Sequence, residues 1–117
     1  RLGAPELILI CGATNDSWAN SPIGEYKYAD WTAKDLKTFR PAMAEMLADL
    51  RRLYPTARIY FILNDCLKKE INDSVHTICT HYSVPCIDLV SIAKQKGHPS
   101  IAGMKSIADQ VTGAIPP

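Results

Sequence analysis

Three short apolar segments, separated by stretches of helical periodicity, most constrain how this chain can fold. They cover residues 6–11, 58–63 and 84–89 and lack the polar alternation of a strand with one face in water. Such segments are typical of parallel strands covered on both faces. Because strands that alternate with helices are joined by right-handed crossovers, we predict an α/β fold: a parallel sheet with helices on both faces.

Three stretches of apolar residues at helical spacing lie between and after these strands. Pro41 suits a first helical turn and Pro55 ends the element, which predicts a helix near residues 36–54. Residues 17–31 show no period and predict a long aromatic loop. The apolar positions of the three stretches are Met43, Met46, Leu47, Leu50 and Leu53, then Ile71, Val75, Ile78, Cys79 and Tyr82, and finally Met104, Ile107, Ala108 and Val111.

The charge balance excludes two classes of partner. The chain has 13 Lys and Arg against 12 Asp and Glu, a formal net charge of +1, so no basic surface for nucleic acid is indicated. The longest apolar runs are far shorter than the roughly 18–20 residues that span a bilayer. We expect neither a nucleic-acid nor a membrane partner.

The cysteines and two of the histidines give no pattern that predicts a metal or a disulfide framework. Cys11, Cys66, Cys79 and Cys86 form no Cys-x-x-Cys pair. We interpret them as free, mostly buried thiols. Cys79, His81 and Cys86 match no familiar zinc spacing, and His76 and His81 are interpreted as structural or solvated residues. We therefore expect no metal and no cofactor.

A sheet of three parallel strands has only one central strand, whereas all three segments here are apolar enough for two covered faces. We therefore expect further strands, from upstream sequence or from a second chain.

Candidate chemistry lies in the loops that follow the strands, because ligands of parallel α/β sheets bind at the carboxyl ends of the strands. Asn15 follows the first strand and His98 follows the third. An amide donor opposite an imidazole base suits acyl transfer. The alternatives are turn chemistry for Asn15 and a surface or capping role for His98. Asn64 and Asp65 follow the second strand, where they either line the site or form a turn.

The aromatic loop admits two interpretations. Trp18, Tyr26, Tyr28 and Trp31 either wall a substrate pocket or clamp the loop onto the domain.

Two segments resemble sequence blocks of the SGNH, or GDSL-type, esterase and lipase family. Residues 10–16 read Ile-Cys-Gly-Ala-Thr-Asn-Asp and resemble its third block, and residues 97–100 read Gly-His-Pro-Ser, followed by Gly103, and resemble its fifth. The string Asn-Asp-Ser-Trp-Ala-Asn-Ser-Pro over residues 15–22 is most similar to bacterial members. The resemblance implies a three-layer, flavodoxin-like α/β/α fold and ester hydrolysis through an acyl-enzyme. It assigns Asn15 to the oxyanion hole, where losing a donor costs about 100- to 1000-fold in rate, and His98 to the general base.

The sequence departs from the family pattern in three places. No Gly-Asp-Ser block and no second-block Gly occur, so the resemblance implies that residues 1–117 are the C-terminal part of a single domain, inactive without the nucleophile upstream. Ala13 replaces a Gly, and Gln95 replaces the Asp expected three residues before His98. The base could still act in a Ser-His dyad, oriented by Gln95, by Asp88 or by a backbone carbonyl. Ser17 and Ser21 lie near Asn15 but not on the tight turn that a nucleophile needs.

Two functions from different classes remain. Relatives that resemble this chain are often exported carbohydrate deacetylases, which implies an acetylated glycan or other small ester as substrate and a periplasmic or extracellular location. The alternative is a noncatalytic α/β ligand-binding module that has lost the triad, which Gln95 and Ala13 favour. A nucleotide site ranks lower, because no Gly-x-Gly-x-x-Gly or P-loop follows any strand.

Overall fold

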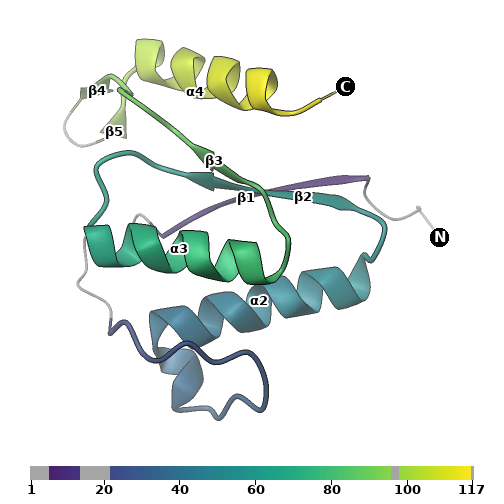
Figure 1. Ribbon diagram of the computed structural model, residues 1–117. Helices are drawn as coiled ribbons and strands as arrows, with labels where there is room; N and C mark the ends of the chain where they lie inside the picture. The colour runs from purple at the N-terminus through teal and green to yellow at the C-terminus, as the bar shows by residue number, and fades with distance from the viewer. Residues whose placement is uncertain (1–5, 14–21, 96–97, 117) are drawn as a thin grey trace.

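The protein contains a three-stranded parallel sheet in the order β1-β2-β3 (Figure 1). The structure is a computed structural model that describes residues 6–13, 22–95 and 98–116, with Gln95 and His98 described for the backbone alone. β1 spans Leu7–Gly12, β2 spans Arg58–Leu63 and β3 spans Cys86–Asp88. β1 pairs with β2 from Leu7 opposite Arg58 to Gly12 opposite Leu63. β2 is therefore the central strand, as its continuous apolar run requires.

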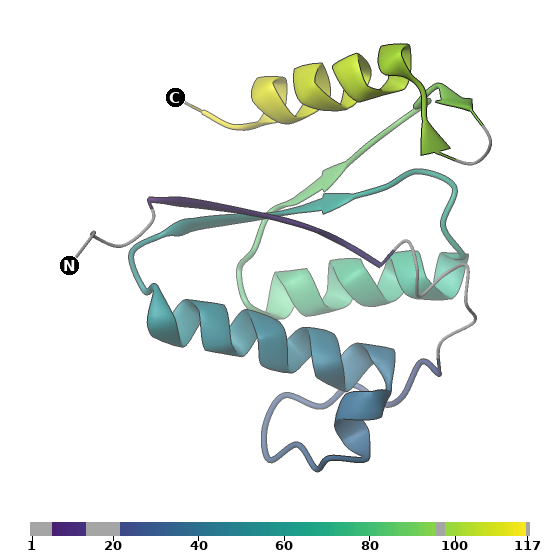
Figure 2. The same cartoon turned by 180° about the vertical axis from the view of Figure 1, so that it is seen from behind.

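Helices cover both faces of this sheet. α2 (Phe39–Leu53) and α3 (Lys69–His81) lie on one face, and α4 (Ile101–Ala114) lies on the other (Figures 1 and 2). A short 3-10 helix, η1 (Asp35–Lys37), precedes α2. The predicted α/β fold and element order are confirmed, and no helix in the described ranges has the length and apolarity needed to cross a bilayer.

The start of α2 is set by the preceding loop, not by a capping side chain. The backbone N–H groups of Phe39 and Arg40 donate to the carbonyls of Pro22 and Ile23, at 2.8 and 2.9 Å. These bonds satisfy N–H groups that a helix start otherwise leaves unpaired. A Cβ at Gly24 would lie 2.1 Å from the Thr38 hydroxyl, and Gly24 has φ +70°, so glycine is required at this close approach.

The core divides at the sheet. On the side of α2 and α3, Ile59, Phe61 and Leu63 of β2 pack with residues of both helices. On the side of α4, a smaller cluster forms around Ile62, packed against residues of α4. Alternate residues of β2 therefore pack into core clusters on opposite faces of the sheet. The buried members of the larger cluster are Ala13, Phe39, Met43, Ala44, Leu47, Ile59, Phe61, Leu63, Ile71, Val75, Ile78, Cys79 and Val84, and those of the smaller one are Ile62, Ile87, Leu89 and Ile92.

β1 differs from the prediction that every strand is buried on both faces. It occupies an edge of the three-stranded sheet, and only its α2-facing residues Ile8 and Ile10 pack against the core. Leu7 and Leu9, on the opposite face, are 36% and 45% exposed. The prediction of two covered faces is therefore wrong for β1 in the described chain. One face of β1 is uncovered because α4 packs over β2 and β3 instead.

The expectation of mostly buried thiols is also wrong. All four cysteines are free thiols, but Cys11 and Cys66 are exposed and Cys86 is half-buried, whereas Cys79 is buried. Cys11 is exposed because it shares the uncovered face of β1 with Leu9.

The third strand and the segment after it also differ from the prediction. β3 is three residues long because only Cys86, Ile87 and Asp88 form ladder pairs with β2. Pro85 precedes the ladder and accepts a bond from the N–H of Phe61. Two short strands not predicted from the sequence, β4 (Lys94–Gln95) and β5 (His98–Pro99), then form an antiparallel pair.

Replacement of a core leucine tests this description of packing. Leu47 of α2 is fully buried, so Leu47→Ala in the full-length gene product is expected to lower the free energy of unfolding by about 2–5 kcal/mol. Leu53→Ala is the matched control, because Leu53 ends the same helix with 56% of its surface exposed. Its expected loss is about 0.5 kcal/mol. Urea unfolding followed by circular dichroism measures both, and equal losses would contradict the assignment of the core.

Candidate active site

The candidate site lies at the carboxyl edge of the sheet, where three loops begin. Each loop contains a non-glycine residue in the left-handed region of backbone space: Ala13 after β1, Cys66 after β2 and Ser91 after β3, with φ of 73°, 57° and 51°. This conformation costs about 1–2 kcal/mol for a residue with a Cβ. Strained backbone of this kind concentrates at functional sites, where the surrounding structure maintains it.

Ala13 stands where the family pattern has glycine, and it adopts a backbone conformation that suits glycine. Its side chain is buried, and its φ is one that glycine adopts without steric cost. The replacement of glycine by Ala13 therefore has a cost in backbone conformation. Asn15, two residues further, lies outside the described residues, as does Trp18.

Asp65 fixes the loop after β3 to the end of β2. Its Oδ2 accepts a 2.9 Å bond from the N–H of Ile92, and its Oδ1 pairs with the ammonium of Lys94. Only 12% of the Asp65 side chain is exposed. Because Lys94 begins β4, this carboxylate joins the central strand to the hairpin that contains His98.

The charge of Asp65 is favoured by these contacts. Burial opposes ionisation, but the bonds from Lys94 and from the N–H of Ile92 outweigh it and lower the pKa of the carboxyl. Because the pKa is lower in the folded chain than in the unfolded one, the stabilisation is complete above the unfolded value of about 3.9. It is lost as the pH falls through the folded value.

A second anchor holds the hairpin to the start of α4. The carbonyl of Ala93 accepts bonds from the N–H and the hydroxyl of Ser100, at 2.9 and 3.2 Å. The Ser100 hydroxyl also accepts from the N–H of Gly103, which makes Ser100 the N-cap of α4. A Cβ at Gly103 would lie 2.0 Å from the Ala93 carbonyl oxygen, so only glycine permits this approach.

His98 and Gln95 occupy facing positions in the hairpin. His98 is the first residue of β5, and its Cα partner in the antiparallel pair is Gln95 of β4. The position three residues before the histidine is thus directly across the ladder from it. Position 95 is the one at which the family pattern has an acid.

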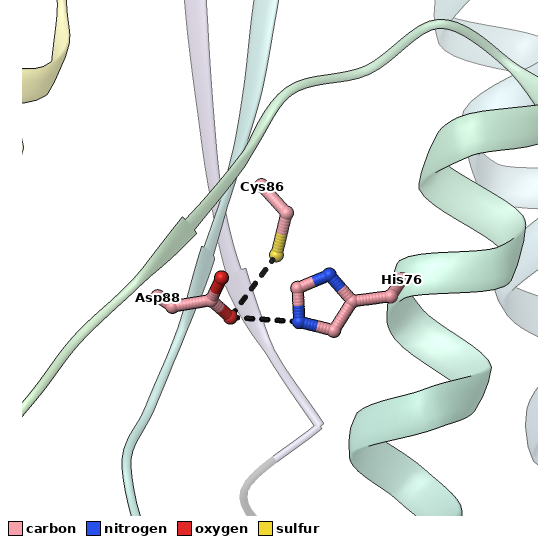
Figure 3. Close-up of side chains that lie close together, drawn as sticks. All are labelled: His76, Cys86 and Asp88. Atoms are coloured by element: carbon pink, nitrogen blue, oxygen red, sulfur yellow. Dashed lines mark hydrogen bonds and ion pairs between the residues drawn. The ribbon is translucent and has the colours of Figure 1, made fainter.

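Asp88, the carboxylate considered as an orienting group for His98, is bound to a different imidazole. Its Oδ1 accepts a 2.8 Å bond from Nε2 of His76 on α3, and the thiol of Cys86 lies 3.9 Å from the same oxygen (Figure 3). The third strand therefore directs its last carboxylate towards α3.

The aromatic residues of the described loop contact the helices. The ring of Tyr28 stacks on His81 at 3.6 Å, and the Trp31 indole N–H donates to the Lys27 carbonyl at 2.8 Å. The Arg40 guanidinium lies 4.0 Å from the centre of the Tyr26 ring. Residues 22–38 lie beyond α2 and α3, on the side away from the sheet (Figure 2). These are the contacts expected for a clamp, and a substrate role for Tyr26 and Trp31 stays a prediction.

Asn64 makes the turn contact considered for it, and its role in substrate binding stays a prediction. Its Oδ1 accepts a bond from the N–H of Asp65 at 2.9 Å, which is turn chemistry. It also lines an open depression at the carboxyl edge together with His76, Asp88 and Leu89.

A cavity of about 340 Å³ opens beside the end of β1. Most of its walls are apolar, which suits an acyl chain or a packed segment better than a charged ligand. The lining residues are Ile10, Cys11, Gly12, Ala13, Pro22, Leu36, Lys37, Thr38, Phe39, Ala42, Met43, Met46 and Phe61.

Comparison with known proteins identifies the family of this arrangement. The sequence profile of the GDSL-like lipase/acylhydrolase family matches residues 1–115. Among solved structures, a candidate GDSL-like lipase from Bacteroides ovatus is 54% identical, with a TM-score of 0.92 over 97% of this chain and 55% of that one. Another from Bacteroides uniformis is 53% identical, with a TM-score of 0.94 over 97% and 54%. No curated protein matches the chain.

A third structure, of a protein from Lactobacillus plantarum, shares the fold alone. It is 20% identical, with a TM-score of 0.75 over 92% of this chain and 65% of that one. The chain thus spans about half the length of the two Bacteroides structures it matches.

Removal of the Asp65 carboxylate tests how the hairpin is positioned. In Asp65→Ala the N–H of Ile92 loses its acceptor, so its hydrogen exchange is expected to accelerate by about tenfold, with a loss of about 1–3 kcal/mol in stability. The matched control is Asp109→Ala, because Asp109 pairs with Lys105 on the exposed surface of α4. Exchange measured by mass spectrometry over residues 90–95 should respond to the first change alone. Equal protection in both variants would contradict the anchoring role of Asp65.

Proposed function

Because this chain belongs to the GDSL-like lipase/acylhydrolase family of hydrolases, we propose that the full-length protein hydrolyses carboxylic esters through a serine acyl-enzyme. In this proposal the nucleophile lies outside the chain, His98 is the general base and Asn15 is the oxyanion donor. One observation carries it: Gly12 and Leu63 are partners in the ladder, and Asp65, just beyond Leu63, holds the hairpin of His98. The turn that leads to Asn15 therefore leaves the end of β1, and the segment that contains His98 is anchored at the end of the neighbouring strand β2.

The chemistry follows from these roles. The serine Oγ attacks the acyl carbon while His98 accepts the hydroxyl proton, and the Asn15 amide donates to the developing oxyanion. The ester C–O bond then breaks, and the proton passes to the leaving alkoxide. A water molecule attacks the acyl-enzyme with its proton going to the same imidazole, which releases the carboxylic acid and restores the serine. An acetylated carbohydrate is the substrate class we propose, on the resemblance given above.

The open edge of β1 supports an upstream segment as the source of the missing strands. Leu7 and Leu9 are exposed at an edge strand that has unpaired backbone groups, a combination that folded proteins normally cover. The Bacteroides structures extend over nearly twice the length that this chain matches. A second chain is the alternative source, and the mass of the full-length protein in solution distinguishes the two.

Replacement of His98 tests the base. His98→Ala in the full-length gene product is expected to lower kcat for an activated aryl ester by about 100- to 10,000-fold, the contribution of general acid–base catalysis. His81→Gln is the control, because His81 stacks on Tyr28 at the end of α3. Unchanged turnover in His98→Ala would refute the assignment.

Labelling with a fluorophosphonate distinguishes the two proposed functions, a serine esterase and a noncatalytic binding module. A label upstream of Arg1, located by mass spectrometry, supports the proposed nucleophile, and a label on Ser17 or Ser21 contradicts it. Absence of both label and turnover in the folded protein favours the noncatalytic module.

Restoration of a carboxylate tests the role of position 95. Since Gln95 is the ladder partner of His98, Gln95→Asp is expected to raise kcat at least about tenfold by stabilising the imidazolium. The reverse change in a Ser-His-Asp triad costs about 10⁴-fold. Gln95→Asn has the length of aspartate without its charge and should give no gain. An equal effect of both variants on kcat would show that charge at this position does not matter.

A further inference from the structure

A group of metal-ligating side chains joins α3 to β3. His76 projects from α3, whereas Cys86 and Asp88, two residues apart, project from the same side of β3 (Figure 3). One ligand atom from each lies within 4.8 Å of the other two. Nε2 of His76 is 2.8 Å from Oδ1 of Asp88, and the Cys86 sulfur is 3.9 Å from that oxygen.

The 2.8 and 3.9 Å distances lie on either side of those in a tetrahedral site. Bonds of about 2.0–2.3 Å to nitrogen, oxygen and sulfur place neighbouring ligand atoms about 3.3–3.8 Å apart around a zinc ion. To form the site, a side-chain rotation moves the Asp88 carboxylate away from Nε2, and the Cys86 sulfur moves closer to the other two ligand atoms. Both groups have room for it, because the side chains of His76 and Asp88 are 41% and 53% exposed.

We propose that His76, Cys86 and Asp88 bind one divalent transition-metal ion of the zinc type. One thiolate, one imidazole and one carboxylate form a mixed set that favours zinc over the hard, oxygen-preferring cations magnesium and calcium. A water molecule completes the tetrahedron from the open depression that His76 and Asp88 line. The site is separate from the roles given to His98 and Asn15.

Metal binding replaces the hydrogen bonds of the free cluster. In the metal-free chain, a hydrogen bond with Cys79, then burial and the Asp88 charge, raise the pKa of the Cys86 thiol. The ion displaces the thiol proton, which passes to solvent, and neutral His76 binds through Nε2 with its one proton on Nδ1. Cys79 is buried one helical turn beyond His76 and forms a side-chain hydrogen bond with Cys86.

Zinc titration of the full-length gene product tests this site. The protein is stripped with a chelator, kept reduced with a phosphine and titrated with Zn²⁺ by calorimetry. We expect one site that is lost or weakened by more than the 10- to 100-fold typical of outer-shell changes in each of Cys86→Ser, His76→Gln and Asp88→Asn. Cys11→Ser and His81→Gln are controls outside the cluster and should bind within about twofold of wild type.

The Co²⁺ complex provides a second measurement that identifies the ligands. Thiolate-to-cobalt charge transfer and strong d–d bands are expected in the wild type, and the charge-transfer band should disappear in Cys86→Ser. Circular dichroism verifies that each variant is folded, and Asp88→Asn is the conservative choice because its side chain is half exposed. The proposal is overturned if the wild type does not bind Zn²⁺. It is also overturned if folded Cys86→Ser and His76→Gln bind Zn²⁺ as tightly as the wild type, because the cluster is then only a surface ion pair.

Discussion

The pairing of the central strand β2 with a parallel neighbour on each side is the constraint on which the rest of the structure depends. It fixes the carboxyl ends of β1, β2 and β3 at one edge, and it buries both faces of β2 under different helices. Each large apolar side chain it buries contributes about 1.5–3 kcal/mol. Asp65 can act as an anchor because it lies two residues after the end of this rigid strand. Its bond to the N–H of Ile92 therefore fixes the loop after β3 relative to β2.

The parts of the fold that the sequence predicts are those with a strong hydrophobic pattern. β2 occupies the predicted residues because its apolar run is continuous, and α2 and α3 follow their stripes. The start of α2 shifts to Phe39 because loop carbonyls satisfy its first N–H groups, which no local pattern shows. β4 and β5, at two residues each, are too short to have a period and depend on tertiary anchors at Ala93 and Asp65.

The candidate site divides in a similar way. His98 and Asn15 come from motif resemblance, and Asp65 gave a turn signal that did not reveal its contacts with Ile92 and Lys94. The cluster of His76 and Asp88 gave no signal, because helix and strand bring together residues that no motif spacing links. The sequence instead drew attention to His81, whose ring stacks on Tyr28 and is not part of this cluster.

The engagement of Asp88 by His76 changes how His98 must be supported. Oδ1 of Asp88 already accepts the bond from His76, which leaves this carboxylate less available to orient another imidazole. The support that the described residues offer to His98 is positional: Asp65 and Ser100 hold its hairpin from both sides. Positioning can fix the direction of a base, and displacements of about 1 Å cost roughly 100-fold in rate. Under the proposed roles it cannot stabilise the imidazolium charge, so neutral Gln95 makes electrostatics, more than geometry, the part of the proposed site that differs from the family pattern.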